Sequence, residues 1–187
     1  NALKENHEII KVGYRNGDII CDYTDPDSVD EMFEKSGRFD ALISVVGNDS
    51  VFKPYPSLAE EDYLYGFERK FLGQIRLVKK GMSHINDNGV FVLTSGFLSH
   101  YPNPYSLATG PLNAAVDTYV KNGALLLQRG IRLNVVSPAP VVDSGQQPQK
   151  GTVTAKETAE YYTEAIDGEY TGKILRAWGG LPVPQES

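Results

Sequence analysis

The amino-acid sequence predicts an α/β protein built as a doubly wound parallel sheet with helices on both faces. Short apolar segments alternate along the chain with longer segments of helical pattern, which is the order of βαβ units. The apolar segments show no polar alternation, as expected of strands that are covered on both faces. The length of 187 residues suits one domain with a sizeable core, so we expect a single domain over residues 1–187.

Composition and charge restrict the classes of function. Hydrophobic residues make up 41% of the chain and charged residues 22%, as in folded globular proteins. The net charge of -6 disfavours a nucleic-acid partner, which requires a basic surface. No apolar run approaches the ~20 residues of a membrane span. Cys21 is the single cysteine, and we expect a buried thiol in a reducing compartment, the cytoplasm.

Local signals in the first half of the chain predict three strands and two helices. Asp25 and Pro26 fit the N-cap and first position of a helix that runs to about residue 35. Ser57 and Glu60 fit the start of a long helix over about 58–82. Strands are expected over residues 8–12, 18–21 and 41–47.

The second half continues the alternation of strands and helices. Thr154 and Glu157 form a capping-box pattern ahead of a helix that ends near residue 166. Another helix is expected from about residue 112 to residue 128. Strands are expected over residues 89–95, 132–137 and 171–178.

The order of elements predicts that part of the sheet precedes Asn1. A dinucleotide-binding sheet begins with a strand and a Gly-rich turn, which lets a pyrophosphate approach a helix N-terminus. Residues 1–10 instead fit the end of that first helix running into the second strand. We expect roughly 20 residues, the size of a strand–turn–helix unit, to precede Asn1. The alternative, a sheet without its central strand, would expose buried edges.

The most informative segment covers residues 89–140. It reads GVFVLTSG, then YSLATGPLNAAV, then GIRLNVVSPAP, a strand ending in hydroxyls, a helix, and a strand ending in a turn. This layout resembles the catalytic half of the short-chain dehydrogenase/reductase family, and residues 170–180 resemble the closing strand of that family. The resemblance rests on the order and spacing of the motifs. It implies one Rossmann-like NAD(P)-binding domain.

Three residues near the start are candidates for binding the adenosine part of the cofactor. Arg15 follows the first visible strand, where no acidic residue is present to meet a ribose 2′-hydroxyl. It favours NADP over NAD, because a guanidinium pairs with a 2′-phosphate; the alternative is a solvated loop arginine. The resemblance implies that Asp22 meets the adenine amino group and that Tyr23 supplies a backbone amide. The alternative is that Asp22 and Asp25 only cap the next helix.

The resemblance implies three further cofactor positions. Gly47 stands where a family glycine lets the backbone pass close to the ribose. Pro138 matches the turn that receives the nicotinamide, although Ala139 replaces the family's glycine. Val141 falls where a backbone amide holds the carboxamide.

The family's catalytic positions can be aligned in two ways. The family uses a tyrosine as acid/base, a lysine four residues later on the same helix face, and an earlier serine that holds the substrate oxygen. Ser95 fits the serine. In one register Tyr105 is the acid/base and Thr109 replaces lysine, with a shortened loop. In the other, which we prefer because it needs almost no gap, Thr109 replaces tyrosine and Asn113 replaces lysine.

Both registers lose the lysine. A tyrosine without a nearby cation keeps a pKa near 10 and is a poor base at neutral pH. Lys70 stands where the family has a helical asparagine, and it would point toward the same cleft. There it would lower the pKa of Tyr105 or bind an anionic substrate. The alternative is a surface lysine in the charged run 68–70.

The expected function is that of an NADP-preferring oxidoreductase that acts on a small carbonyl or alcohol through altered catalytic groups. A second hypothesis is a dinucleotide-binding sensor or partner-binding module without redox turnover. A Rossmann-like enzyme for another nucleotide, such as a methyltransferase, is disfavoured by the Pro138 turn and by Thr171 and Gly172. No His, Cys or Asp cluster has metal-ligand spacing. The family resemblance implies a homodimer or homotetramer, with no nucleic-acid or membrane partner expected.

Overall fold

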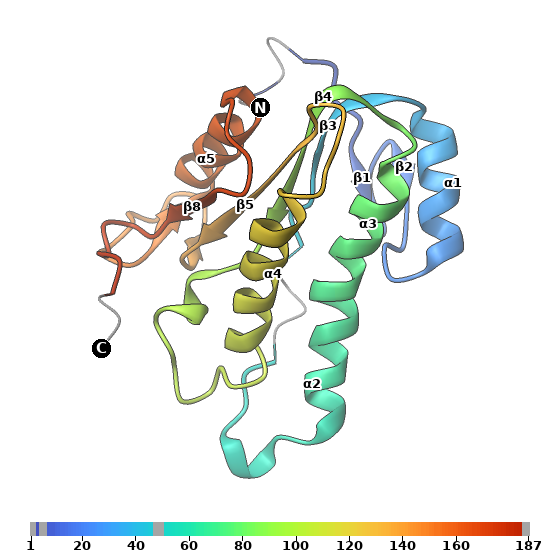
Figure 1. Ribbon diagram of the computed structural model, residues 1–187. Coiled ribbons are helices and arrows are strands. Elements are labelled where there is room, and N and C mark those ends of the chain that lie inside the picture. Colours follow the sequence, from blue (N-terminus) through green and yellow to red (C-terminus); the bar gives the residue numbers. More distant parts are fainter. Residues whose placement is uncertain (1–2, 4–6, 47–50, 185–187) are drawn as a thin grey trace.

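The structure, a computed structural model, describes residues 3, 7–46 and 51–184. At its centre lies a parallel sheet of four strands in the order β3–β4–β5–β8 (Figure 1). These strands are β3 (Phe39–Ile43), β4 (Ile85–Thr94), β5 (Arg132–Pro138) and β8 (Ile174–Ala177). The predicted parallel α/β sheet is confirmed.

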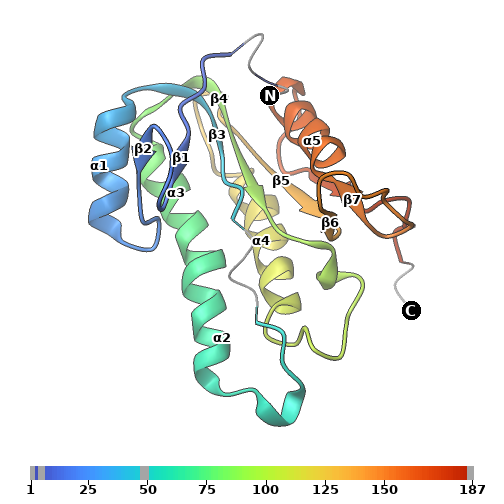
Figure 2. The same cartoon turned by 180° about the vertical axis from the view of Figure 1, so that it is seen from behind.

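Helices cover both faces of this sheet, as Figures 1 and 2 show from opposite sides. α3 (Gly73–Gly81) and α4 (Gly110–Gly123) pack on one face, and α5 (Ala155–Asp167) packs on the other. Neighbouring residues of β4 serve opposite faces, because Phe91 belongs to the core under α3 and α4, whereas Val92 belongs to the core under α5. The lack of polar alternation in this strand therefore reflects two buried faces.

Two of the predicted helix caps are confirmed. α1 (Pro26–Ser36) begins where the Asp25 carboxylate accepts a hydrogen bond from the backbone amide of Asp27 at 3.0 Å. At the start of α5, the Thr154 amide donates to Glu157 Oε2 at 2.7 Å, and the Glu157 amide donates to Thr154 Oγ1 at 3.1 Å. Both caps join residues that are at most three positions apart, so local sequence determines them.

The predicted cap of the long helix is wrong. Ser57 belongs to a separate 3-10 turn, η1 (Tyr55–Ser57), and its hydroxyl donates to the backbone oxygen of Pro54 at 2.9 Å. The Asp62 carboxylate instead accepts a hydrogen bond from the Ala59 amide at 3.0 Å. Ser57 cannot cap the helix because the chain is extended at Leu58 and Ala59, which separate it from the first helical residue.

The long helix over 58–82 is interrupted in its middle. α2 (Glu60–Gly66) leads into a π-helical segment, η2 (Phe67–Leu72), which leads into α3. A π-helical turn widens the helix, and such turns are frequent at functional sites. Lys70 lies inside this segment and is buried.

The first two strands are shorter than expected. β1 (Val12–Gly13) and β2 (Ile19–Ile20) pair with each other in parallel and form a separate sheet among the described residues. The predicted segments 8–12 and 18–21 were longer. Little burial supports longer strands there, because Ile10 is 44% exposed.

Three further boundaries differ from expectation. α4 ends at Gly123, whereas the helix was expected to reach about residue 128. Leu125 beyond this end is 83% exposed, so no apolar burial supports a longer helix. β3 ends at Ile43, before residue 47. β8 begins at Ile174, whereas the strand was expected to begin at residue 171. Gly172 has a φ of 75°, so the chain turns there before the strand starts.

Two short strands extend the fold beyond the carboxyl end of β5. β6 (Val141–Val142) pairs in parallel with β7 (Val153–Thr154). The single turn η3 (Phe97–Ser99) lies at the same end of the sheet, after β4. In the part of the chain that the structure describes, no helix is both long and apolar enough to cross a membrane.

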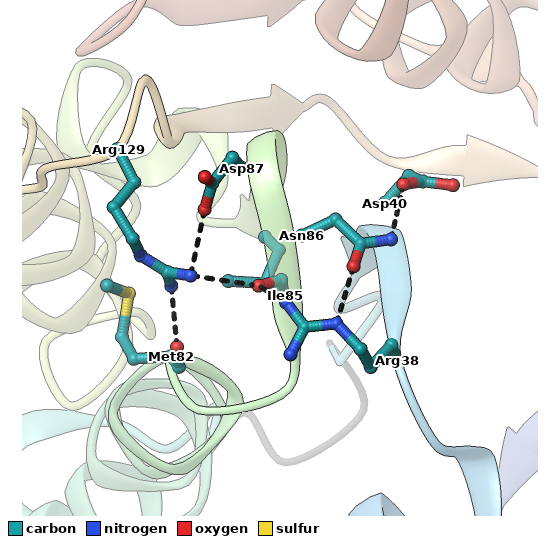
Figure 3. A network of polar contacts seen from close by, with 7 residues as sticks. All are labelled: Arg38, Asp40, Met82, Ile85, Asn86, Asp87 and Arg129. Carbon is teal, nitrogen blue, oxygen red and sulfur yellow. Dashed lines mark hydrogen bonds and ion pairs between the residues drawn. The ribbon is translucent and has the colours of Figure 1, made fainter.

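A polar network ties the amino end of β4 to its neighbours (Figure 3). Arg129 donates to the backbone oxygen of Met82 at 2.7 Å and to Asp87 Oδ1 at 3.1 Å. Arg38 donates to Asn86 Oδ1 at 2.7 Å. This network lies at the opposite end of β4 from Thr94, where the strand ends.

Candidate active site

A cavity of about 360 Å³ opens at the carboxyl ends of β4 and β5, the edge at which open α/β sheets bind ligands. Lys70 from η2, Ser95 after β4 and Pro138 at the end of β5 line it. Thr109 and Asn113 join them at the start of α4. The volume lies within the range of small-molecule sites. Four of the five residues expected to carry catalysis thus share one cavity.

Lys70 reaches the end of β4. Its side chain is only 5% exposed, and Nζ donates a hydrogen bond to the backbone oxygen of Ser95 at 2.9 Å. One turn later Gln74 Nε2 donates to the backbone oxygen of Thr94 at 3.0 Å, which fastens the helix to the same strand end. The surface-lysine alternative for Lys70 is therefore wrong. A buried ammonium costs free energy unless it is paired or hydrogen-bonded, and the backbone oxygen of Ser95 supplies one such bond beside the cavity.

The first turn of α4 closes the cavity on another side. Thr109 is 2% exposed, and its hydroxyl donates to the backbone oxygen of Val51 at 2.9 Å. Asn113 is 1% exposed and packs against Gly96, where an added Cβ atom would lie 2.9 Å from Asn113 Nδ2. Within the described part of the chain, Asn113 Oδ1 has no hydrogen-bond partner. Thr109 is thus committed to the backbone, whereas Asn113 has acceptor capacity left.

Tyr105 lies outside the group of described residues that line the cavity. It is 53% exposed, and its amide donates to Asn103 Oδ1 at 2.8 Å in a turn that directs this loop outward. Lys70 contacts Ser95 at the strand end instead. The geometry therefore gives no support to the register in which Tyr105 is the acid/base and Lys70 lowers its pKa.

A different tyrosine approaches the end of β4 from the other face. The Tyr162 hydroxyl, on α5, shares a hydrogen bond with Thr94 Oγ1. Burial raises the pKa of Tyr162 to about 12. Such a group does not release a proton at neutral pH, so Tyr162 is no substitute for the family's tyrosine.

Asp117 is a residue of this region that the sequence analysis missed. It lies one helical turn after Asn113 on α4 and is 5% exposed. Burial raises the pKa of its carboxyl group, and the Ser95 hydroxyl is the side chain that most strongly opposes this rise. The available signal was its spacing, because residues four apart share a helix face.

The expected adenosine-binding residues lie around β1, β2 and the start of α1, outside the described cavity lining. Arg15 is exposed in the turn between β1 and β2, with its guanidinium carbon 5.9 Å from the centre of the Tyr14 ring. Asp22 Oδ1 accepts hydrogen bonds from the amide and hydroxyl of Thr24, at 2.9 and 2.6 Å. Hydrogen bonding from Thr24 is the main cause that lowers the pKa of Asp22. Tyr23 packs against Gly73, where an added Cβ atom would lie 2.5 Å from its ring.

The expected nicotinamide-binding residues are partly assembled. Pro138 lines the cavity. Val141 is not part of the described lining and is 49% exposed. Gly47 is not among the residues that the structure describes. A nicotinamide group fits this end of the site. Two buried acceptors of the lining, Ser95 Oγ and Asn113 Oδ1, find no partner among the described residues, and buried polar atoms are normally satisfied.

Metal chemistry has no comparable support. Over residues 7–46 and 51–184, no group of three or more His, Cys, Asp or Glu side chains is placed to hold a metal ion. The polar atoms around the cavity are instead a lysine ammonium, hydroxyls and a side-chain amide. Such groups bind and orient an oxygen-containing ligand through hydrogen bonds.

Comparison with known sequences identifies relatives. The family model described as enoyl-(acyl carrier protein) reductase matches residues 2–166. A hydroxynaphthalene reductase-like protein of Metarhizium brunneum is 31% identical over 142 residues, which are 72% of this chain and 52% of that protein. The chain therefore spans about half the length of the curated relatives that it matches.

Solved structures agree with the sequence comparison. The protein lin1944 from Listeria innocua is 31% identical, with a TM-score of 0.86 over 95% of this chain and 90% of that chain. A small-chain dehydrogenase in complex with NADPH is 28% identical, with a TM-score of 0.77 over 86% of this chain and 81% of that chain. Since the family model covers most of the sequence and the shared fold covers nearly all of it, the chain belongs to the short-chain dehydrogenase/reductase family.

Proposed function

We propose that the protein is an NADP-preferring oxidoreductase that acts on a small carbonyl or alcohol, with Lys70 and Ser95 at its reacting centre. The observation that carries the proposal is the 2.9 Å hydrogen bond between Lys70 Nζ and the backbone oxygen of Ser95, inside the cavity. A similar dehydrogenase is described in complex with NADPH, which supports the choice of cofactor.

Each residue of the cavity has a role in this proposal. The Ser95 hydroxyl holds the substrate oxygen by a hydrogen bond. The Lys70 ammonium adds positive charge close to that oxygen, which stabilises the negative charge that develops there during reduction. Asn113 Oδ1 accepts a hydrogen bond from the ligand, and Thr109 fixes the start of α4 through Val51. The bound nicotinamide supplies or accepts the hydride.

The substrate fits a mixed lining. Beside its polar groups the cavity has apolar walls, formed by Phe52, Phe97 and Leu98. An apolar wall favours a carbon skeleton, and one ammonium favours a polar oxygen at the other end. The proposed substrate is therefore a small carbonyl compound or alcohol with an apolar side.

The remaining cofactor positions are proposed from the family resemblance. Arg15 pairs with the ribose 2′-phosphate, Asp22 and the Tyr23 amide meet the adenine, Gly47 lies near the ribose, and the Val141 amide holds the carboxamide. The exposure of Arg15 and Val141 leaves both accessible to a ligand.

We also propose a homodimer or homotetramer and a cytoplasmic location. An open groove between η2 and α4, lined in part by Phe71, Ala115 and Tyr119, supports assembly through these helices. Multi-angle light scattering of the wild type and of Ala115→Glu tests it. We expect the charged variant to shift toward the monomer.

The main test measures cofactor binding and turnover separately. Binding of NADPH and NADH is followed by fluorescence, and NADPH oxidation is then measured with a panel of small carbonyl compounds. We expect Ser95→Ala and Lys70→Met to bind NADPH as the wild type does and to lose roughly 10²–10³-fold in kcat, the cost of removing one group that stabilises an oxyanion. Lys79→Met, an exposed change on α3, is the matched control.

A sensor or partner-binding module is the second candidate. The observation that favours it is that the described lining of the cavity contains no tyrosine. NADPH binding without oxidation by any carbonyl, unchanged in Ser95→Ala and Lys70→Met, would support the sensor. Failure to bind either cofactor would exclude both candidates.

A further inference from the structure

The pairing of β3 with β4 stops before the end of β4, and a side chain takes its place. Near the end of this ladder the Ser44 amide donates to the backbone oxygen of Val92 at 2.9 Å. Beyond it, the Thr94 amide donates to Gln74 Oε1 at 2.8 Å, and the Thr94 backbone oxygen accepts from Gln74 Nε2 at 3.0 Å. A glutamine amide has the donor and acceptor of a peptide group, so Gln74 continues the ladder beyond β3.

The backbone of Thr94 depends on this substitute partner. In a continued parallel ladder the Thr94 amide would donate to the Ser44 oxygen, but that oxygen accepts from Thr94 Oγ1 at 2.6 Å. Gln74 is 0% exposed, so solvent does not compete for these contacts. Because buried backbone groups need partners, removal of the Gln74 amide leaves the strand end unsatisfied.

The same amide also binds the π-helical segment. Gln74 Nε2 donates to the backbone oxygen of Lys70 at 2.8 Å, so its two hydrogens serve two backbone oxygens. In η2 the Gly73 amide donates to the oxygen of Glu68, five residues earlier, and this pattern displaces backbone oxygens from ordinary α-helical pairing. One buried side chain therefore joins η2 to the end of β4.

Lys70 and Gln74 bind neighbouring residues of β4. Lys70 Nζ donates to the backbone oxygen of Ser95, and Gln74 holds Thr94, the residue before it. Ser95 has separate support, because its amide donates to the backbone oxygen of Val136 at 3.0 Å. The lysine side chain is long and has many rotamers, so the position of its ammonium depends on how η2 lies against the strand end.

We propose that Gln74 is a positioning residue of the active site: its amide fixes η2 against the end of β4 and thereby places the Lys70 ammonium beside the reacting oxygen. This inference rests on the proposed function, because Lys70 there stabilises the charge on that oxygen. Gln74 is outside the described lining of the cavity, so it acts through Lys70 without touching the substrate. The alternative, a glutamine that only satisfies a strand end, predicts lower stability with normal turnover.

The first experiment tests the contacts without cofactor or substrate, by hydrogen exchange measured with NMR. Among the described residues Gln74 is the only buried glutamine, and its side-chain protons should exchange more slowly than those of the exposed glutamines. Gln74→Met keeps the length of the side chain but has no amide, so the Thr94 amide should exchange faster in this variant. Unchanged exchange at Thr94 would overturn the proposed connection.

The second experiment is a double-mutant cycle in carbonyl reduction, with the wild type, Gln74→Met, Lys70→Met and the double variant. We expect Gln74→Met to keep the Kd for NADPH and the KM and to lose roughly 10–10²-fold in kcat, because displacement of a group by about 1 Å can cost 10²-fold. In the Lys70→Met background the same change should lower kcat by less than about twofold, since the ammonium is already absent. Equal losses in both backgrounds would show that Gln74 does not act through Lys70.

Asn134 on β5 provides the matched control. It is 0% exposed like Gln74, and its amide also joins two backbone groups: Nδ2 donates to the Tyr170 oxygen at 3.0 Å, and Oδ1 accepts from the Lys173 amide at 3.1 Å. It does not belong to the described cavity lining. Asn134→Leu should therefore lower the free energy of unfolding about as much as Gln74→Met does, yet keep the wild-type kcat. Equal losses of kcat in the two variants would reduce Gln74 to a structural role.

Gln74→Glu covers the case in which Gln74→Met does not fold. The carboxyl group keeps an acceptor for the Thr94 amide, but it carries at most one proton and cannot donate to the Lys70 and Thr94 oxygens together. We expect kcat to fall in this variant while NADPH binding stays that of the wild type. A wild-type kcat would contradict the positioning role.

The outcomes separate this inference from the proposed function. If the wild type reduces carbonyls and Gln74→Met keeps its kcat, the inference is wrong and the oxidoreductase stands. If the wild type binds NADPH but reduces no carbonyl, the oxidoreductase is wrong and the positioning role falls with it, even where hydrogen exchange shows the contact with Thr94.

Discussion

At the scale of single residues, two ionisable side chains near the carboxyl end of β4 are buried, and burial penalises their charged forms. Lys70 is 5% exposed and stabilised by the backbone oxygen of Ser95, whereas Asp117 is equally buried and keeps one oxygen without a partner in the described chain. At a protein surface, water solvates a charged group and removes the free-energy cost of burial. Water is largely excluded from these two side chains. We therefore expect the charged form of each side chain to cost stability in the folded protein.

Asp117 should make stability depend on pH in a defined direction. Its pKa is raised in the folded protein, so above about pH 4 the folded state binds more protons than the unfolded state and the free energy of unfolding falls as the pH rises. Asp117→Asn removes this fall, so the stability of the variant relative to the wild type should rise as the pH rises from about 4 through the folded pKa of Asp117. Urea unfolding at several pH values measures the difference. A difference that does not change with pH would contradict this.

Gly96 should be essential for the position of Asn113. Its φ of 168° is extended backbone that any residue adopts, so Gly96→Ala causes no strain in the chain. The new Cβ atom would lie 2.9 Å from Asn113 Nδ2 and displace that amide. We expect a stability loss of at most about 1 kcal/mol, because a side-chain end gives way easily, and a larger proportional loss of kcat. Thermal unfolding and kinetics on the same sample distinguish the two effects.

The sequence predicted individual site residues unevenly. Lys70 was identified because it replaces a family residue on the cavity-facing side of the long helix, and burial now supports that reading. Tyr105 is the acid/base in one register because it is a tyrosine after Ser95, although that register shortens the loop. The turn that directs this loop outward has no simple sequence signal. Asp117 was missed although its spacing four residues after Asn113 was available, because its burial depends on tertiary packing that no local pattern shows.

At the scale of elements, the polar network at the amino end of β4 contains contacts that should differ in their contribution to stability. Arg129 donates to a backbone oxygen at 2.7 Å and also forms an ion pair with Asp87. The ion pair is more than one-third exposed on both sides, and exposed pairs contribute little. The backbone contact closes the end of α3 and should matter more.

A pair of variants tests this ranking. Arg129→Met removes the backbone and carboxylate contacts while keeping the aliphatic stem, and we expect a loss of about 1–2 kcal/mol in the free energy of unfolding. Asp87→Asn removes only the charge of the exposed partner and should cost at most about 0.5 kcal/mol. Chemical denaturation measures both. Equal losses in the two variants would show that the ion pair dominates.

Helix ends were predictable to the extent that they depend on neighbours in sequence. The caps at Asp25 and Thr154 need only residues within one turn, and both are confirmed. The cap at Ser57 is wrong because two extended residues, Leu58 and Ala59, separate it from α2. The π-helical segment 67–72 was not predictable, since its six residues have ordinary helical composition and the widening depends on tertiary contacts.

At the scale of the whole molecule, the two ends of the sheet differ in the groups that they carry. The amino end of β4 carries the network of Arg129, and the carboxyl ends of β4 and β5 carry the cavity. The parallel fold was predictable because continuous apolar runs and alternating elements repeat along the chain. The pairing of β1 with β2 was not predictable, because no local pattern determines which strands pair.

Cofactor binding should stabilise the whole molecule. A ligand at 100 times its Kd adds about 2.7 kcal/mol, which corresponds to a rise of about 5–10 °C in Tm for a chain of this size. We expect this rise with NADPH and a smaller one with NADH. Arg15→Ala should remove most of the difference between the two cofactors and leave the effect of NADH unchanged. An unaltered preference for NADPH in this variant would exclude Arg15 as the phosphate ligand.

The π-helical segment has an evolutionary consequence. It holds one residue more per turn than the α-helices on either side, so a single inserted codon separates it from an unbroken helix. Deleting one residue between Lys70 and α3 would rotate that ammonium by about 100° relative to α3 and remove it from the cavity. A single insertion or deletion therefore separates this protein, in which the lysine is buried, from an ancestor or descendant in which the same lysine is exposed to solvent.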